Sequence, residues 1–271
     1  MRIIFIGDIM GRSGREALEK HLPHLREELK PDIIIVNGEN ATNGRGINIK
    51  ACKQFYDWGV DCITTGNHIW DQREIISHIA KDEKLLRPLN FPPGTPGSGV
   101  YKHRLNDGRT ITIVNAMARL FMDAIDDPFQ AINTLLSEEK LGRTTDAILV
   151  DFHGEATSEK LSFAHYIDGK VTAVVGTHTH IPTADAHILE NGTAYQSDAG
   201  MTGDYNSVIG VKKEMAMQRF IKKMPGERFL PASGEATLCG CLIVSNDKTG
   251  KAVSIDPIRL GGILPGIMPT A

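Results

Sequence analysis

The sequence predicts an α/β protein built around a parallel or mixed central sheet. Three observations lead to this class. Strand-like and helix-like segments alternate through the first half of the chain. Asn-Asp-Gly at 106–108 and Asn-Gly at 191–192 then mark two antiparallel hairpins. The 271 residues suffice for a sizeable core and contain no linker or repeat, so we expect a single domain over residues 1–271.

The first half reads as three strand–helix pairs. Residues 3–7 are an apolar, β-rich run, and residues 33–36 are Ile-Ile-Ile-Val, which is typical of a strand buried on both faces. Leucines at helical spacing predict a helix over 14–29, and Pro23 is expected to kink it. The remaining expected elements are a helix over 47–58, a strand over 60–65 and a helix over 71–80.

The second half shifts toward antiparallel strands. A Pro- and Gly-rich loop over 87–99 leads into it, and residues 201–235 form a long, weakly patterned segment, a length that usually marks a functional or mobile region. The expected strands are 100–105, 110–114, 147–152, 171–176, 237–245 and 252–259, with a hairpin over 183–197. The expected helices are 128–140, 158–167 and an amphipathic piece over 212–223.

Composition excludes several classes of protein. The net charge is −3, so there is no basic excess that would predict a stable nucleic-acid complex. No apolar run reaches the roughly 18 residues of a membrane span, and the first apolar run stops at Asp8, unlike a signal peptide. The four cysteines lack zinc or redox spacing and are expected to be buried, reduced thiols. We therefore expect a cytoplasmic protein with no membrane partner.

Five polar segments each follow an apolar strand. In open α/β sheets, loops beyond the carboxyl ends of the strands converge on one crevice, so distant residues can share a site. Packing alone does not explain Asp, Glu, Asn and His at this position five times. The segments are Gly7-Asp8, Asn37-Gly38-Glu39-Asn40, Gly66-Asn67-His68, Phe152-His153-Gly154-Glu155 and Gly176-Thr177-His178-Thr179-His180.

These segments supply the donor atoms of a hard or borderline metal site. Carboxylate and amide oxygens with imidazole nitrogens suit Fe or Mn, and Zn is also compatible. The candidates exceed what one tetrahedral ion needs. They suit two transition-metal ions about 3.5–4 Å apart that share a carboxylate and clamp a phosphoryl oxygen. The seven candidate metal ligands are Asp8, Glu39, Asn40, Asn67, His153, His178 and His180.

The segments resemble blocks of the calcineurin-like metallophosphoesterases. Gly66-Asn67-His68 looks like the Gly-Asn-His block of that superfamily, and Gly176-Thr177-His178-Thr179-His180 looks like its Gly-His-x-His block. The chain is more closely similar to the YmdB-like branch, whose members are described as 2′,3′-cyclic-nucleotide phosphodiesterases. This resemblance spans nearly the whole chain through Asp8-Ile9-Met10-Gly11, Asn37-Gly38-Glu39-Asn40-Ala41, Thr65-Gly66-Asn67-His68-Ile69-Trp70-Asp71 and Asp198-Ala199-Gly200-Met201-Thr202-Gly203.

The resemblance implies a fold and a ligand set. The fold is a four-layer αββα sandwich, in which two mixed sheets pack together and helices flank them. Of the two ions, one would be held by Asp8, Asn40 and His180, the other by Asn67, His153 and His178, and Glu39 would bridge them. Two departures from the broad superfamily sharpen the assignment, because Met10 replaces a ligand histidine and Glu39 replaces a bridging aspartate. Asn40 could fill the coordination place that Met10 cannot.

The resemblance also implies a reaction. A hydroxide that bridges the two ions would attack phosphorus in line, and His68 would protonate the leaving oxygen as general acid. Asp71 is expected to orient His68. For a 2′,3′-cyclic nucleotide, loss of the 2′-oxygen gives a 3′-nucleotide. The implied partner is a small-molecule phosphodiester, and a homo-oligomer is compatible with the sequence.

The residues themselves indicate only a phosphoester-type metal site, so other functions stay open. They are a phosphomonoesterase, a 3′,5′-cyclic phosphodiesterase, a ribonuclease, and a regulatory scaffold that uses the metal site for binding. Thr42, Asn43 and Arg45 are candidate substrate contacts because they lie close to Glu39 in the chain. A basic group near 212–223 is interpreted as a solvated helix face, with an anion-attracting rim as the alternative; it comprises Lys212, Lys213, Arg219, Lys222 and Lys223.

Overall fold

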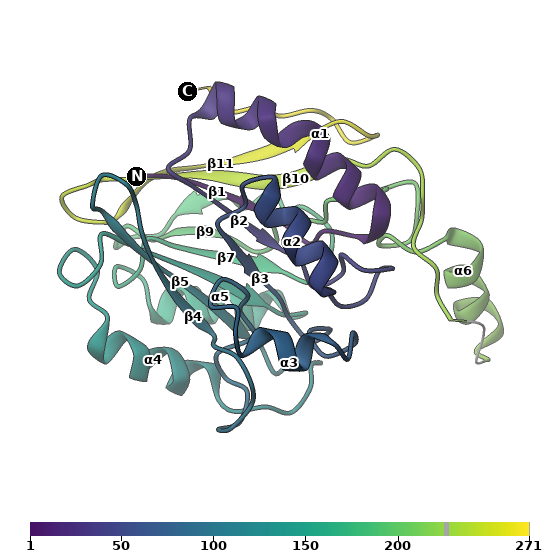
Figure 1. The fold of residues 1–271 in the computed structure, drawn as a ribbon, viewed down its shortest axis with the longest axis horizontal. Helices are drawn as coiled ribbons and strands as arrows, with labels where there is room; N and C mark the ends of the chain where they lie inside the picture. Colours follow the sequence, from purple (N-terminus) through teal and green to yellow (C-terminus); the bar gives the residue numbers. More distant parts are fainter. Residues whose placement is uncertain (225–227, 271) are drawn as a thin grey trace.

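Two β-sheets lie face to face between two groups of helices in the computed structural model, which describes residues 1–224 and 228–270 (Figure 1). The first sheet has the order β11-β10-β1-β2-β3, with strands at Ala252–Leu260, Leu238–Ser245, Arg2–Ile6, Ile33–Asn37 and Cys62–Thr64. The second has the order β4-β5-β6-β7-β9-β8, with strands at Val100–Arg104, Thr110–Met117, Ala147–His153, Ala173–Thr177, Ala194–Gln196 and His187–Ile188.

Both sheets are mixed. In the first, β1, β2 and β3 run parallel, and β10 pairs antiparallel with both β1 and β11. In the second, β5, β6, β7 and β9 run parallel, while β4 and β8 are antiparallel strands at the two edges. Each sheet therefore contains a run of adjacent parallel strands, and the carboxyl ends of these strands carry the polar segments.

Alternation along the strands explains the layers. Ile3 and Phe5 on β1 face the core between the sheets, whereas Ile4 and Ile6 face the helices. Full burial of each such side chain stabilises the fold by roughly 1.5–3 kcal/mol. The helices α1 (Gly11–Leu29), α2 (Ile49–Asp57) and α3 (Ile75–Ile79) cover the first sheet, and α4 (Pro128–Glu138) and α5 (Thr157–Tyr166) cover the second. The predicted four-layer αββα sandwich is confirmed.

Most predicted elements are present, with shifted ends. Helix α1 begins at Gly11 rather than residue 14 and continues through Pro23 without interruption. The predicted helix over 71–80 is wrong in its first half, since α3 begins only at Ile75. The preceding residues form turns instead, in which the backbone N–H of Asp71 bonds the carbonyl of His68. The hairpin turn at 191–192 is confirmed between the short strands β8 and β9.

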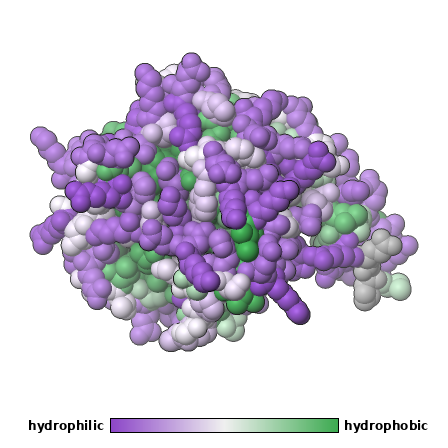
Figure 2. Space-filling view, viewed as in Figure 1, coloured by the Kyte–Doolittle hydropathy of each residue, from purple (hydrophilic) through white to green (hydrophobic). Residues whose placement is uncertain are grey.

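Helix α6 (Lys213–Lys222) projects from the body of the protein and is the one helix of the long 201–235 segment within the described residues (Figure 1). Its apolar side chains Met217, Phe220 and Ile221 are exposed, and hydrophobic colour marks this projection among otherwise mostly hydrophilic residues in Figure 2. Across residues 1–224 and 228–270, no helix combines the length and hydropathy needed to cross a membrane.

Candidate metal centre

All seven predicted ligands meet where strands of both sheets end. Asp8, Glu39 and Asn67 follow β1, β2 and β3 of the first sheet. His153 is the last residue of β6, and His178 directly follows β7, both in the second sheet. The sequence places them here because each strand is a mainly apolar run, and the polar side chains of the cluster come at or just after its carboxyl end. The ligand set is thus divided between the two sheets.

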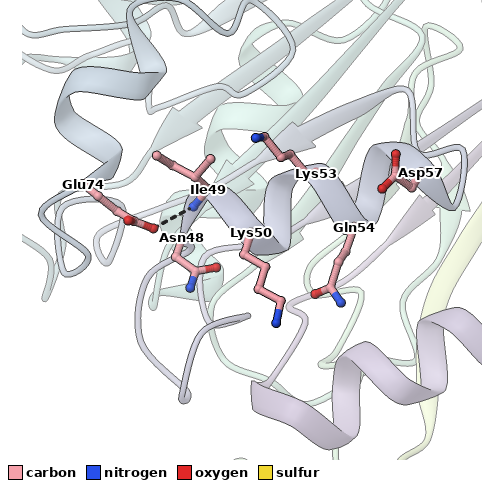
Figure 3. Close-up of a pocket in the computed structure, with 7 residues that line it drawn as sticks. All are labelled: Asn48, Ile49, Lys50, Lys53, Gln54, Asp57 and Glu74. Carbon is pink, nitrogen blue, oxygen red and sulfur yellow. Dashed lines mark hydrogen bonds between the residues drawn. The ribbon is translucent and has the colours of Figure 1, made fainter.

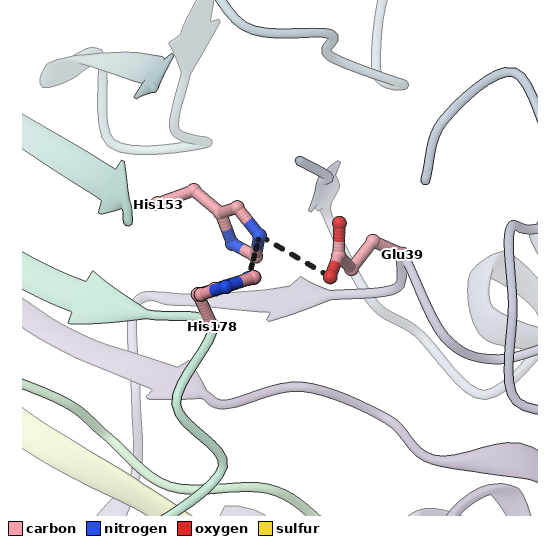
Figure 4. Close-up of side chains that lie close together, drawn as sticks. All are labelled: Glu39, His153 and His178. Carbon is pink, nitrogen blue, oxygen red and sulfur yellow. Dashed lines mark hydrogen bonds and ion pairs between the residues drawn. The ribbon is translucent and has the colours of Figure 1, made fainter. Parts of the chain in front are cut away.

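Glu39, His153 and His178 form the centre of the cluster (Figure 4). The Nε2 atom of His153 lies 3.2 Å from Oε1 of Glu39 and 3.1 Å from Nδ1 of His178. One donor atom from each of these residues lies within 4.8 Å of the others. Glu39 and His153 are fully buried and His178 is partly buried, so most of these closely spaced polar atoms are shielded from water.

Asn67 completes this half of the cluster. Its Oδ1 atom lies 3.0 Å from Nε2 of His153, with the amide oxygen rather than the nitrogen turned inward. The close approach depends on the neighbouring Gly66, because a Cβ atom there would overlap both the ring of His153 and the carboxylate of Glu39.

Asp8, Asn40 and His180 form the other half. The Oδ2 atom of Asp8 accepts the backbone N–H of His178 at 3.2 Å, and its Oδ1 atom lies 4.0 Å from Nε2 of His180. The Nδ2 atom of Asn40 lies 3.0 Å from Oε1 of Glu39 and 3.1 Å from Nε2 of His180. Glu39 therefore contacts both halves of the cluster. Asn40 presents its amide nitrogen here, so a ligand role requires the amide to turn over and present its oxygen.

The loop that carries His178 and His180 is held in a strained conformation. Both histidines have positive φ angles, 101° and 69°, which are unusual for residues other than glycine. Asp198 accepts the backbone N–H and the hydroxyl of the intervening Thr179 at 2.9 and 2.7 Å. The buried Lys160 binds Asp198 at 3.0 Å and the carbonyl of Thr177 at 2.8 Å. This ion pair fixes the backbone on either side of His178.

Burial and mutual charge set the protonation of the metal-free cluster. Burial raises the pKa of Asp8 to about 7, although the neighbouring His180 and His153 partly oppose the rise. Burial, together with the positive charge of His153, lowers the pKa of His178 to about 3. For Glu39, burial favours the neutral acid, but contact with His153 outweighs it and holds the pKa below its ordinary range. Burial opposes charge on His153 too, yet Glu39 raises its pKa to about 9.

His68 lies beside the cluster rather than in it. Its backbone N–H donates to Oε2 of Glu39 at 3.2 Å, which anchors the residue next to that carboxylate. Its Nδ1 atom lies 3.0 Å from Oδ2 of Asp71, the residue that we expected to orient it. Arg45 forms an ion pair with the same carboxylate oxygen at 3.0 Å and has a half-exposed side chain. Thus the ring of His68 is held through one nitrogen and keeps the other available.

Other predicted contacts lie away from the cluster or serve the fold. Thr42 is buried, and its hydroxyl accepts the backbone N–H of Asn48 at 3.0 Å. Asn43 is exposed at a turn with φ of 53°. The side chain of Met10, at the position where the broader superfamily has a histidine, is buried beside Gly44 and Gly210. The predicted basic group lies on or at the ends of the projecting helix α6.

The roles of several residues that support the cluster were not predicted from the sequence. Asp151 and Thr177 are fully buried behind His153, and the carbonyl of Ile209 lies 2.8 Å from Nδ1 of His180. Glu155 lies 3.3 Å from Nε2 of His178. The one available signal was Asp151, a charged residue in the otherwise apolar strand β6.

A surface hollow of about 610 Å³ lies elsewhere, along α2 (Figure 3). None of the predicted ligands lines it. It contains no histidine, and its carboxylates Asp57 and Glu74 are accompanied by Lys50 and Lys53. This hollow has volume but lacks the donor set of a transition-metal site, so the cluster of buried histidines and carboxylates is the better candidate centre.

The cluster fits metal ions on the evidence of its own atoms. The Oδ1 atom of Asp8 is fully buried yet has no hydrogen-bond partner, which is costly for a carboxylate oxygen unless a cation neutralises it. His180 is directed at Ile209 through Nδ1, which leaves Nε2 facing the cluster. Oxygen and imidazole donors of this kind suit Mn, Fe or Zn.

Two mixed sheets flanked by helices, with this cluster at the ends of their parallel strands, define the metallophosphoesterase fold. The family model described as "YmdB-like protein" matches residues 4–258. The chain belongs to the YmdB-like family, as its motifs predicted.

Individual relatives agree with this assignment. The chain is 45% identical over 260 residues to the 2′,3′-cyclic-nucleotide 2′-phosphodiesterase of Bacillus subtilis (strain 168). The aligned region covers 96% of this chain and 97% of that protein. A crystal structure of a hypothetical protein from Thermus thermophilus superposes with a TM-score of 0.90 at 43% identity, covering 97% of this chain and 100% of that one. A phosphatase from Mycoplasma pneumoniae gives a TM-score of 0.89 at 33% identity, covering 96% and 93%.

Proposed function

We propose that this protein is a metal-dependent phosphodiesterase that hydrolyses 2′,3′-cyclic nucleotides to 3′-nucleotides. The observation that carries the proposal is the meeting of seven metal-type ligands beside a histidine whose ring is held by a carboxylate, in a chain 45% identical to a 2′,3′-cyclic-nucleotide 2′-phosphodiesterase. The substrate is a small molecule, and the free, buried state of all four cysteines fits the reducing cytoplasm.

We assign the ligands to two sites, with Fe or Mn favoured. Asp8, Asn40 and His180 would hold one ion, Asn67, His153 and His178 would hold the other, and Glu39 would be shared. Glu39 supports this role because it contacts both Asn40 and His153. When bound, such ions lower the pKa of a water molecule and neutralise charge on phosphoryl oxygens.

His68 is the proposed proton donor to the leaving oxygen. Asp71 faces its Nδ1 atom, so Nε2 is the nitrogen available to substrate. In a 2′,3′-cyclic nucleotide, cleavage of the bond from phosphorus to the 2′-oxygen leaves an alkoxide that takes this proton. The 3′-ester bond stays intact and the product is a 3′-nucleotide. The half-exposed guanidinium of Arg45, next to Asp71, is the proposed contact for a phosphate oxygen.

A substrate comparison tests the proposal. Purified protein supplied with Mn²⁺ or Fe²⁺ is assayed on 2′,3′-cAMP, 3′,5′-cAMP, p-nitrophenyl phosphate and single-stranded RNA. We expect turnover of 2′,3′-cAMP with 3′-AMP as the product. No turnover of 2′,3′-cAMP with either metal overturns the proposal. Preferential turnover of 3′,5′-cAMP, p-nitrophenyl phosphate or RNA would instead identify a 3′,5′-cyclic phosphodiesterase, a phosphomonoesterase or a ribonuclease.

Metal content provides a second, independent test. Protein purified without chelators is expected to contain two transition-metal ions per chain by elemental analysis. Fewer than one ion per chain after reconstitution would contradict a two-metal site. The Glu39→Gln variant tests the scaffold alternative. If this variant has no hydrolytic activity but still corrects the defect of a strain that lacks the gene, a scaffold role replaces catalysis as the cellular function.

A further inference from the structure

Asp151 is a buried carboxylate that connects the two sheets directly behind the candidate metal centre. It belongs to β6 of the second sheet and is 0% exposed. Its Oδ2 atom accepts from Nδ2 of Asn37 at 2.9 Å and from the hydroxyl of Thr64 at 2.5 Å, both in the first sheet. Its Oδ1 atom accepts from the hydroxyl of Thr177 on β7 at 2.7 Å. The two oxygens thus face three donor groups.

Thr177 connects Asp151 to the predicted ligand His153. Its Oγ1 atom also lies 2.8 Å from Nδ1 of His153. A threonine hydroxyl has one proton to donate. Since that proton goes to Asp151, the threonine oxygen must accept a proton from Nδ1 of His153. The other ring nitrogen, Nε2, is the one that faces Glu39, Asn67 and His178.

We propose that Asp151 and Thr177 are positioning residues that hold His153 in the Nδ1–H form, so that the lone pair of Nε2 is directed at the metal. Metal-binding histidines commonly donate their second N–H to an outer partner, which fixes the ring and its tautomer. Here the partner is a hydroxyl backed by a carboxylate. Because Asp151 also binds Asn37 and Thr64, the same group ties the orientation of a ligand to the packing of the two sheets.

Two substitutions at Thr177 separate the hydroxyl from the bulk of the side chain. Thr177→Val keeps the shape and removes the hydroxyl, whereas Thr177→Ser keeps the hydroxyl. This inference rests on the metal site of the proposed function, so the readout is Mn²⁺ binding to metal-free protein by titration calorimetry, with no substrate present. We expect Thr177→Val to weaken Mn²⁺ binding about 10–100-fold, the usual cost of losing an outer-shell partner. Thr177→Ser keeps the hydroxyl, so its Mn²⁺ affinity should stay close to that of wild type.

Asp151→Asn provides a test of the direction of the hydrogen bonds. The oxygen of the new amide can still accept from Asn37 and Thr64, so its NH2 group must face Thr177. The threonine hydroxyl would then donate to Nδ1 of His153 and place the ring proton on Nε2, where it blocks the metal. We therefore expect Asp151→Asn to lose at least as much Mn²⁺ affinity as Thr177→Val. Melting of each metal-free variant shows whether the fold is retained.

The outcomes are decisive even if a variant fails to fold. In zinc-loaded wild-type protein, which is diamagnetic, nitrogen-15 spectra of the histidine rings should show the proton of His153 on Nδ1. A proton-free Nδ1 atom would overturn the inference without any variant. Wild-type Mn²⁺ affinity in folded Thr177→Val would overturn it as well. A failed 2′,3′-cAMP assay with these binding results intact would count against the proposed function alone.

Discussion

The Nδ1 atom of His180 lies 2.8 Å from the carbonyl oxygen of Ile209, and this contact joins the candidate metal centre to the long 201–235 segment. Ile209 has a φ angle of 45°, an unusual value for a β-branched residue. Tyr205 of the same segment donates its hydroxyl to the carbonyl of His180 at 3.0 Å. The weakly patterned segment is therefore part of the ligand support.

Tyr205→Phe should weaken the metal centre without removing a ligand. It leaves the carbonyl of His180 with the backbone N–H of Met201 as its remaining donor. The net loss of one such hydrogen bond costs about 0.5–1.5 kcal/mol. We expect a lower melting temperature and up to about tenfold weaker Mn²⁺ binding, the lower end of the range for outer-shell partners. Tyr101→Phe is the matched control, because that hydroxyl binds His103 on β4. Equal effects of the two variants on Mn²⁺ binding would contradict the role of Tyr205.

Glu39→Gln should remove more metal affinity than the loss of a hydrogen-bond partner behind a ligand. The substitution keeps the shape of the side chain but deletes the charge shared by Asn40 and His153. Outer-shell changes cost about 10–100-fold in affinity, so loss of a bridging carboxylate should exceed about 100-fold. Elemental analysis and calorimetry measure this loss. Two tightly bound ions in the variant would show that Glu39 does not bridge.

His68→Asn should slow catalysis while leaving the metals in place. General acid catalysis contributes about 10²–10⁴-fold, and we expect a loss of that size in kcat for 2′,3′-cAMP. A p-nitrophenyl phosphodiester needs less protonation of its leaving group, so its hydrolysis should fall much less. His165→Asn, at an exposed position on α5, is the control. A loss of metal content in His68→Asn would make His68 a ligand instead.

Metal binding should strengthen as the pH rises from 7 to 9. Glu39 raises the pKa of His153 to about 9 in the metal-free protein, against the opposing effect of burial. The Nε2 proton must leave before that nitrogen can bind a cation. The same raised pKa contributes stability to metal-free protein that is full below about pH 6.5 and is lost as the pH passes 9. Calorimetry of Mn²⁺ binding in buffers of different ionisation enthalpy should detect proton release, and none at pH 7 would contradict this assignment.

Gly66→Ala should disrupt the cluster through a single methyl group. The added Cβ atom would overlap the ring of His153 and the carboxylate of Glu39, so at least one of them must move. We expect Mn²⁺ affinity to fall by more than the roughly 10–100-fold typical of outer-shell changes. Gly266→Ala, whose Cβ atom would meet only Arg259 at 3.7 Å, should bind Mn²⁺ normally. Wild-type affinity in Gly66→Ala would show that the two ligands tolerate the shift.

The residues of the cluster could be located from the sequence because the chain marks the end of each strand. The apolar run over 33–36 can only be a buried strand, and Glu39 and Asn40 are the first chargeable or amide side chains after its last residue, Asn37. The same logic located Asp8 and His178. Such patterns depend on neighbours along the chain, which is why the fold class and the residues of the cluster could both be predicted.

Contacts between distant segments were not accessible in this way. Nothing in the sequence around Thr177 indicates that its hydroxyl bonds both Asp151 and His153, since those contacts depend on how strands register. The start of α3 was misplaced for a related reason. Residues 71–74 look helical in isolation, but the site holds His68 and Asp71 in turns, and tertiary contacts override local preference there.

The division of the ligands between two sheets has a thermodynamic consequence. One sheet contributes Asp8, Glu39 and Asn67, and the other contributes His153, His178 and His180. The proposed ions would therefore link the two sheets and resist their separation on unfolding. A ligand at about 100 times its Kd stabilises the folded state by about 2.7 kcal/mol. The survival of the folded chain against cellular proteases would then follow the supply of iron or manganese. A metal-starved cell would lose the enzyme itself as well as its activity.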